Sequence, residues 1–106
     1  MAKFLVEATY TAEGLKGLQK DKAAGRTAAL KNAIKSLDGQ LEAIYWCLGE
    51  RDVILIADLP DVTAAAALGA AATASGLVRT KTTQLLTAAE IDSALQKATD
   101  YRPPGR

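Results

Sequence analysis

The sequence predicts an α+β domain in which helices cover one face of a four-stranded antiparallel sheet. Strand-length apolar segments alternate with two longer segments of helical spacing, and a tight connection joins the two middle strands. The chain has 106 residues, the length of one domain. We expect this domain to span residues 1–100 and to be followed by a flexible C-terminal tail over residues 101–106.

The first strand is expected over residues 4–10, where apolar and polar side chains alternate. A short helical turn near Leu15 should precede a longer helix from about Lys22, in which apolar residues recur every three or four positions. Arg26 lies within that apolar stripe, and we expect it to reach solvent or to pair with an acid. Gly39 should end the helix in the left-handed conformation.

The second and third strands, residues 41–48 and 53–59, should form an antiparallel hairpin through residues 49–52. Both strands are apolar on both faces, whereas a sheet with one solvated face should carry polar residues there. We therefore expect a second copy of the chain to cover the second face, which makes the protein a homodimer or a higher homo-oligomer. The alternative is a monomer whose terminal helix folds across that face. On the second strand, one face is expected to hold Leu41, Ala43, Tyr45 and Cys47, and the other Ile44, Trp46 and Leu48.

In the second half, Asp61 is a candidate N-cap for an alanine-rich helix over residues 62–75. A fourth strand should follow over residues 77–86. Thr87 and Glu90 have the spacing of a capping box, so a last helix should start there and carry Ala98 on its apolar side. The element order, with this extra C-terminal helix, is that of the ferredoxin-like fold.

Composition excludes several classes of function. The net charge is +1 and no basic cluster occurs, which argues against nucleic-acid binding. The absence of histidine argues against zinc sites and Ser-His-Asp hydrolases, and we expect no catalytic residue, metal or cofactor. No apolar run reaches the ~18–20 residues of a membrane span. The single cysteine, Cys47, and the lack of a leader sequence favour a cytoplasmic location.

The hairpin carries a family resemblance. It reads Tyr45-Trp46-Cys47-Leu48-Gly49-Glu50-Arg51-Asp52-Val53, and this aromatic pair followed by Gly-x-x-Asp resembles the GYD domain family. Matching stretches in the same order extend from about residue 4 to residue 95. Arg51 stands where the family usually has tyrosine, so a role of that phenol does not carry over. The resemblance implies a ferredoxin-like fold of the dimeric α/β-barrel type and little about activity.

Two groups of residues are candidates for ligand binding. Tyr10, Tyr45 and Trp46 could wall a small-molecule pocket, or they could pack in the core or in a dimer interface. Arg79 and Lys81 share one face of the fourth strand and could bind a carboxylate or phosphate, or they could simply keep an edge strand soluble.

Charged residues also gather at the turn. Arg51 could contact an anion or a partner, or the turn could be solvated, with Asp52 bonding nearby backbone donors.

Three functions fit these features. The first is a non-enzymatic oligomer that is structural or senses a small anionic or aromatic molecule. The second is a cofactorless enzyme of the monooxygenase or isomerase type, and the third is a nucleotide-sensing module. Whether the protein is an enzyme stays open at this point. A solvent-open pocket lined by Arg79, Lys81 and an aromatic residue would favour the second or third function, and a filled core the first.

Overall fold

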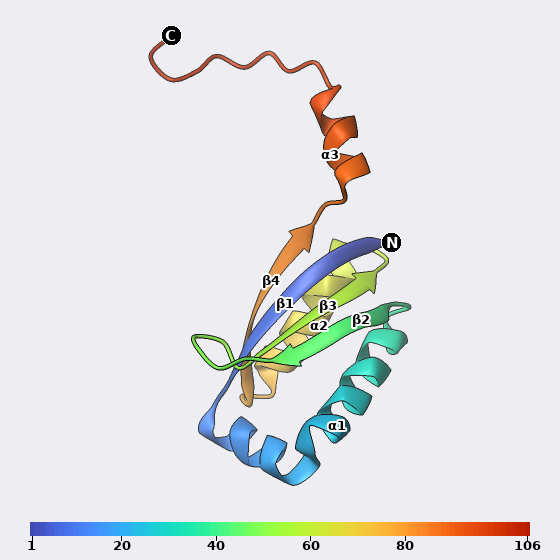
Figure 1. Cartoon of the computed structure of the whole chain (residues 1–106), viewed down its shortest axis with the longest axis vertical. Coiled ribbons are helices and arrows are strands. Elements are labelled where there is room, and N and C mark those ends of the chain that lie inside the picture. Colours follow the sequence, from blue (N-terminus) through green and yellow to red (C-terminus); the bar gives the residue numbers. More distant parts are fainter.

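A computed structural model describes residues 1–106. All four strands form one open antiparallel sheet in the order β2-β3-β1-β4, and the arrangement is consistent with the ferredoxin-like fold. Figure 1 shows α1 and α2 together on one side of this sheet. The elements are β1 (Ala2–Tyr10), α1 (Ala12–Ser36), β2 (Gln40–Trp46), β3 (Val53–Leu59), α2 (Val62–Ala74), β4 (Val78–Leu85) and α3 (Ala88–Leu95).

The core lies between the two central strands and the helices. Alternate residues of β1 and β3 are buried on this face, as the period of a strand requires. Ile34 from α1 and Leu68 from α2 cover them. The opposite face of the sheet, which we call the open face, has no helix against it (Figure 1). The buried strand residues are Phe4, Val6, Ala8, Val53, Leu55, Ala57 and Leu59.

A β-bulge in β2 corrects the predicted faces of that strand. Leu41 pairs with Ala57 and Ala43 with Ile56, so Glu42 is an extra residue on β2. The extra residue moves Leu41 to the helix side, where it packs against the core with Ile44. The prediction that Leu41 shares a face with Ala43 and Tyr45 was therefore wrong, because strict alternation does not survive a bulge.

Helix α1 also differs from expectation. It begins directly after Thr11, whose side chain accepts from the Gly14 nitrogen, and it is broken at Lys22, where φ is 64° and ψ is 168°. The left-handed residue at its C-terminal end is Asp38, with φ of 60°, and not Gly39. Glycine is needed at position 39 for another reason, because a Cβ there would lie 2.5 Å from the Asp58 carbonyl oxygen.

The caps of the later helices agree with the sequence. Asp61 accepts from the Ala64 nitrogen at the start of α2, and Thr87 forms the predicted capping box with Glu90. Helix α3 ends at Leu95, so Ala98 lies outside it, contrary to expectation.

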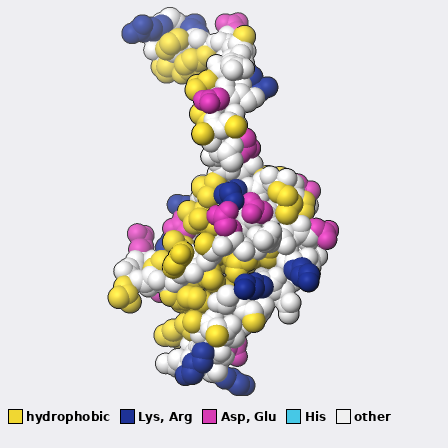
Figure 2. All heavy atoms as spheres, turned by 45° about the vertical axis from the view of Figure 1, so that its right-hand side comes forward, with side chains coloured by type: hydrophobic (Ala, Val, Ile, Leu, Met, Phe, Trp, Pro, Cys, Tyr) yellow, Lys and Arg dark blue, Asp and Glu magenta, His cyan; other side chains and the backbone are white.

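The C-terminal arm, residues 86–106, projects away from the sheet (Figure 1) and gives the molecule extents of 56 × 33 × 23 Å. Its apolar residues Leu86, Leu95 and Tyr101 are exposed, and Figure 2 shows hydrophobic side chains along it. The alternative of a terminal helix folded over the open face is therefore wrong for this structure. None of the helices has both the length and the apolar character needed to span a membrane.

Candidate ligand site

A cavity of about 350 Å³ opens between α1 and α2 at the end of the sheet where β1 finishes and β4 begins. Most of its lining is apolar and comes from facing sides of the two helices. Leu30 and Ala33 line it from α1, Leu68 and Ala72 from α2, and Val78 from β4. Its volume lies at the lower end of the range of about 300–1,000 Å³ for ligand pockets, so it suits a small molecule.

This cavity continues inward to the sheet. A further space of about 60 Å³ is floored by Val6 and Ala8 of β1 and by Val53 and Leu55 of β3. The two spaces have several lining residues in common, which makes them the outer and inner parts of one cavity. The shared residues are Tyr10, Arg26, Leu30, Leu68, Ala72 and Val78.

The start of α1 is fastened to the segment between α2 and β4. The Thr11 nitrogen donates to the Leu77 carbonyl over 2.9 Å, and the Thr11 hydroxyl donates to the Gly76 carbonyl over 3.0 Å. A Cβ on Gly14 would lie 1.9 Å from the same Leu77 oxygen. Only glycine allows the helix to come this close to Leu77. This close approach fixes the position of the first part of α1 beside the cavity.

Tyr10 stands at the junction of the outer and inner parts. Its backbone nitrogen donates to Asp52 Oδ2 over 2.8 Å, which ties the end of β1 to the hairpin turn. Its phenol oxygen accepts from the Trp46 indole nitrogen over 3.4 Å. Tyr10 lines the cavity whereas Trp46 does not, so the two aromatic residues are in contact but do not both form its wall.

Arg26 is the functional candidate that sequence reasoning did not place in a site. It is half-buried and lines both parts of the cavity. It forms no ion pair with any carboxylate of the chain, so of its two expected arrangements the pairing with an acid is wrong, and its partial exposure agrees with the alternative that it reaches solvent. The sequence feature that could have indicated this position is the arginine within an otherwise apolar stripe of the helix.

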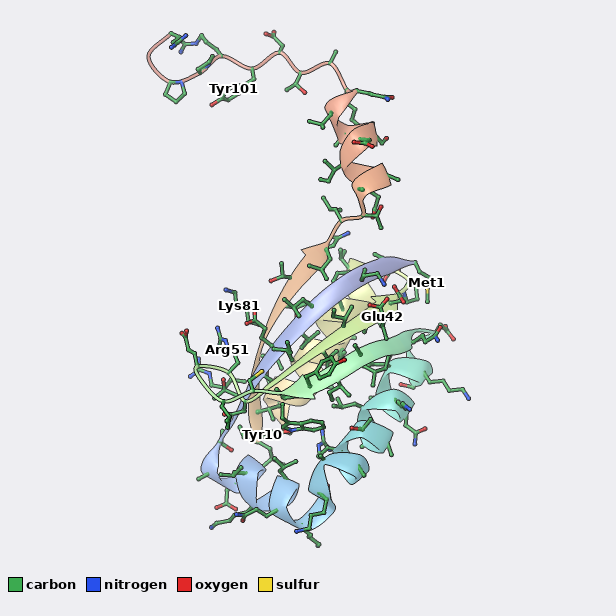
Figure 3. All side chains as sticks on the ribbon, in the orientation of Figure 1. Met1, Tyr10, Glu42, Arg51, Lys81 and Tyr101 are labelled. Atoms are coloured by element: carbon green, nitrogen blue, oxygen red, sulfur yellow. The ribbon has the colours of Figure 1, made fainter.

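The other predicted ligand residues lie on the opposite side of the sheet. Arg79 and Lys81 project from β4, an edge strand, and both are exposed. Tyr45 lies on the open face of β2, the other edge strand, with 68% of its surface exposed. The sheet separates these three from Tyr10 and Trp46, so the five candidates do not form one pocket. Figure 3 shows Lys81 and Tyr10 on their separate elements.

Arg51 and Asp52 of the family turn are engaged in contacts within the chain. The Arg51 Nε lies 3.7 Å from Glu7 Oε2 on β1, and Asp52 holds the Tyr10 nitrogen. Gly49 is exposed, and a Cβ there would meet nothing within 4 Å. The turn is therefore anchored to β1.

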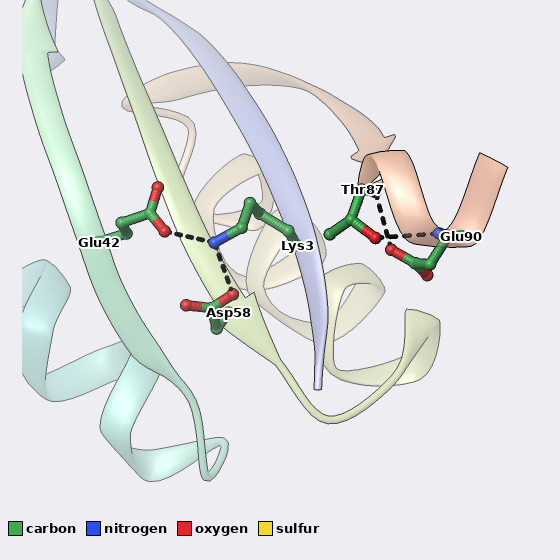
Figure 4. A network of polar contacts seen from close by, with 5 residues as sticks. All are labelled: Lys3, Glu42, Asp58, Thr87 and Glu90. Atoms are coloured by element: carbon green, nitrogen blue, oxygen red, sulfur yellow. Dashed lines mark hydrogen bonds and ion pairs between the residues drawn. The ribbon is translucent and has the colours of Figure 1, made fainter. Parts of the chain in front are cut away.

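The open face combines charged ends with an apolar centre. At one end Lys3 pairs with Glu42 and, over 3.0 Å, with Asp58 (Figure 4). Hydrogen bonds from Lys3 to Glu42 and then to Asp58 raise the pKa of Lys3 above its usual 10.5. Towards the other end lie Glu7, Arg51, Arg79 and Lys81, and Ile54 and Tyr45 share a cross-strand row with Glu7 and Lys81. Leu5 and Ile56 lie between the two charged groups.

No three His, Cys, Asp or Glu side chains are grouped so that they could hold a metal ion. The cavity lining holds one carboxylate, that of Asp21, and one guanidinium, that of Arg26. Such a lining can hold an apolar molecule and orient it through a few polar contacts.

The GYD domain family matches residues 4–95 of the 106-residue chain, and the chain belongs to that family. The match begins within β1 and includes the other three strands and all three helices. No curated protein and no solved structure matches the chain.

Proposed function

We propose that this member of the GYD family is a non-enzymatic, homo-oligomeric module that binds a small organic molecule between its helices and its sheet. The observation that carries this proposal is the two-part cavity, which is apolar in most of its lining and reaches the sheet. Protein interiors are otherwise close-packed. A space of this size at the end of a small core is therefore a feature that a ligand would explain.

The polar groups of the lining favour binding over catalysis. General acid–base catalysis needs titratable groups poised near the working pH, and histidine is the most frequent of them. This lining contains no histidine, cysteine or lysine, and its one carboxylate, Asp21, is exposed at the outer part. A cofactorless enzyme would have to work through the phenol of Tyr10 and the carboxylate of Asp21, and Asp21 lines the outer part of the cavity alone.

For the partner, we propose a second copy of the chain packed on the open face. The apolar centre of that face supports this, because Leu5, Ile54 and Ile56 lie side by side on neighbouring strands without a helix to cover them. A standard interface buries about 800 Å² per partner. The charged groups at both ends of the face would then form the polar rim that interfaces commonly have.

Native mass spectrometry of the purified protein tests the binding function. We expect a small molecule to be retained and to be lost when Ala72→Phe fills the cavity. Ala67→Phe is the matched control, because Ala67 lies on the same helix, is exposed and does not line the cavity. Thermal unfolding of both variants confirms that they fold. A folded Ala72→Phe variant that retains the molecule as the unaltered protein does would contradict the proposal.

A further inference from the structure

We propose that the cavity takes a small carboxylic acid with an apolar body, whose carboxylate is held by Arg26 and by the hydroxyl of Tyr10. This inference rests on the proposed binding function and adds the chemical class of the ligand. Both residues line the outer and the inner part of the cavity, so a ligand that spans the two parts passes them.

Arg26 supplies the positive charge. Arg26 is half-buried and lines both parts of the cavity, where an anion can pair with its guanidinium. The remaining lining around Arg26 is largely hydrophobic, and no carboxylate of the chain lies within ion-pair distance of it. Asp21 is the one acidic residue of the lining, and it belongs to the outer part alone. A bound carboxylate would complete the pairing that the chain leaves open.

Tyr10 supplies a hydrogen-bond donor. Its phenol oxygen already accepts from Trp46 over 3.4 Å, and its hydroxyl proton has no acceptor within the chain. The hydrogen bond from the Tyr10 backbone nitrogen to the Asp52 carboxylate fixes the backbone from which the Tyr10 side chain projects. An oriented donor with a free proton can bond a carboxylate oxygen, and hydrogen bonds to charged groups are stronger than neutral ones.

The lining also restricts the kind of anion. The inner part is floored by aliphatic side chains of the sheet, so the far end of the ligand must be apolar. The lining contains one positive charge, that of Arg26, and one negative charge, that of Asp21 at the outer part, and it contains no lysine. A phosphate dianion would require more positive charge, whereas one guanidinium and one hydroxyl suit the two oxygens of a single carboxylate.

Calorimetric titration with octanoate and with 1-octanol tests the assignment, because the two differ at the head group and share the apolar chain. We expect octanoate to bind at least about tenfold more tightly to the unaltered protein, the ratio typical of one charge-assisted hydrogen bond. Arg26→Met, which keeps the aliphatic stem, should abolish the preference. Tyr10→Phe should weaken octanoate binding severalfold and leave octanol binding unchanged.

Arg79→Met is the control, because Arg79 is an exposed arginine on the other face of the sheet. It should retain the full preference for octanoate. Should Arg26→Met fail to fold, Arg26→Lys keeps the charge without the planar fork and should retain a reduced preference.

Two outcomes would overturn the inference, and they differ in what they say of the proposed function. Equal affinities for octanoate and octanol, unaffected by Arg26→Met, would show that the cavity binds ligands but does not select anions. Binding of neither ligand would refute the assignment to an apolar carboxylic acid. Native mass spectrometry would then show separately whether the protein retains a ligand of another class, which would leave the proposed binding function in place.

Discussion

The carboxylate of Asp52 accepts a hydrogen bond from the backbone nitrogen of Tyr10, with 2.8 Å between Asp52 Oδ2 and that nitrogen. The backbone nitrogen of Asp52 donates in turn to the Ala8 carbonyl over 3.0 Å. The turn after β2 is thereby fastened to the end of β1, next to the cavity. The aspartate of the family turn thus has a visible structural part in positioning Tyr10.

We predict that Asp52→Ala lowers the free energy of unfolding by about 1–3 kcal/mol, the cost of leaving a partly buried donor without its acceptor. Asp52→Asn retains a side-chain oxygen and should lose less. Glu50→Ala is the control, because Glu50 lies in the same turn and is exposed. Urea unfolding of the three variants measures the differences, and equal stabilities of Asp52→Ala and Glu50→Ala would contradict the structural role.

The close approach of Gly14 to Leu77 gives a second prediction. Gly14→Ala would place a Cβ 1.9 Å from the Leu77 carbonyl oxygen, which belongs to the backbone and cannot simply rotate away. We expect a loss of about 1–3 kcal/mol in stability, as for other overpacked positions. Gly17→Ala, three residues further along α1, meets nothing within 4 Å and should gain up to about 1 kcal/mol from helix propensity. Thermal unfolding should move in opposite directions for the two variants.

The sequence was sufficient for the element order, and the first boundaries of α2 and α3 could be predicted because they carry local chemistry. The caps at Asp61 and Thr87 are side-chain to backbone contacts within three residues, and such contacts can be read from spacing alone. The buried alternation of β3 could likewise be predicted, since it follows from the period of a strand.

The errors have tertiary causes. The bulge at Glu42 appears in the pairing of β2 with β3 and leaves no mark in a sequence of mostly apolar residues. Gly39 was assigned a left-handed conformation, whereas its smallness is required by a carbonyl from β3 that only the folded sheet brings near. Arg26 entered the candidate site only when two helices and the sheet were seen to enclose it. Tyr10 and Tyr45 were grouped by residue type, although the sheet lies between them.

The break in α1 at Lys22 provides a third prediction. Its φ of 64° and ψ of 168° belong to a region occupied almost only by glycine, at a cost of about 1–3 kcal/mol for other residues. Lys22→Gly should therefore raise the free energy of unfolding by about 1 kcal/mol. Lys20→Gly, in the helical part just before the break, should lower it by about 1 kcal/mol. A loss of stability in Lys22→Gly equal to that in Lys20→Gly would show that the helix continues through residue 22.

The capping box of α3 predicts a response to pH. Glu90 accepts from the Thr87 backbone nitrogen over 2.9 Å, and this bond, with the hydrogen bond to the Thr87 side chain, lowers the pKa of Glu90 below its usual 4.5. A carboxyl whose pKa is lower in the folded than in the unfolded protein stabilises the folded state at pH values above its unfolded-state pKa. This contribution is lost as the pH falls through its folded-state pKa. The Glu90 side-chain carboxyl carbon, followed by NMR, should titrate below 4.5 in the intact protein. Thr87→Ala should move that midpoint part of the way back, and a midpoint already at 4.5 in the unaltered protein would contradict the capping box.

The proposed interface on the open face can be tested at Tyr45. This residue is 68% exposed on that face and pairs with Ile54, so Tyr45→Asp would place a charge in a sheet-to-sheet contact. Tyr101→Asp is the matched control, because Tyr101 is 69% exposed and lies on the C-terminal arm. If two copies pack through the open face, light scattering should show the mass of a dimer or larger assembly for the unaltered protein and for Tyr101→Asp, and an ~11 kDa monomer for Tyr45→Asp. If Tyr101→Asp abolished the assembly and Tyr45→Asp left it unaffected, the interface would lie on the C-terminal arm and not on the open face. The reason is that an unpaired charge is costly only where the contact excludes water.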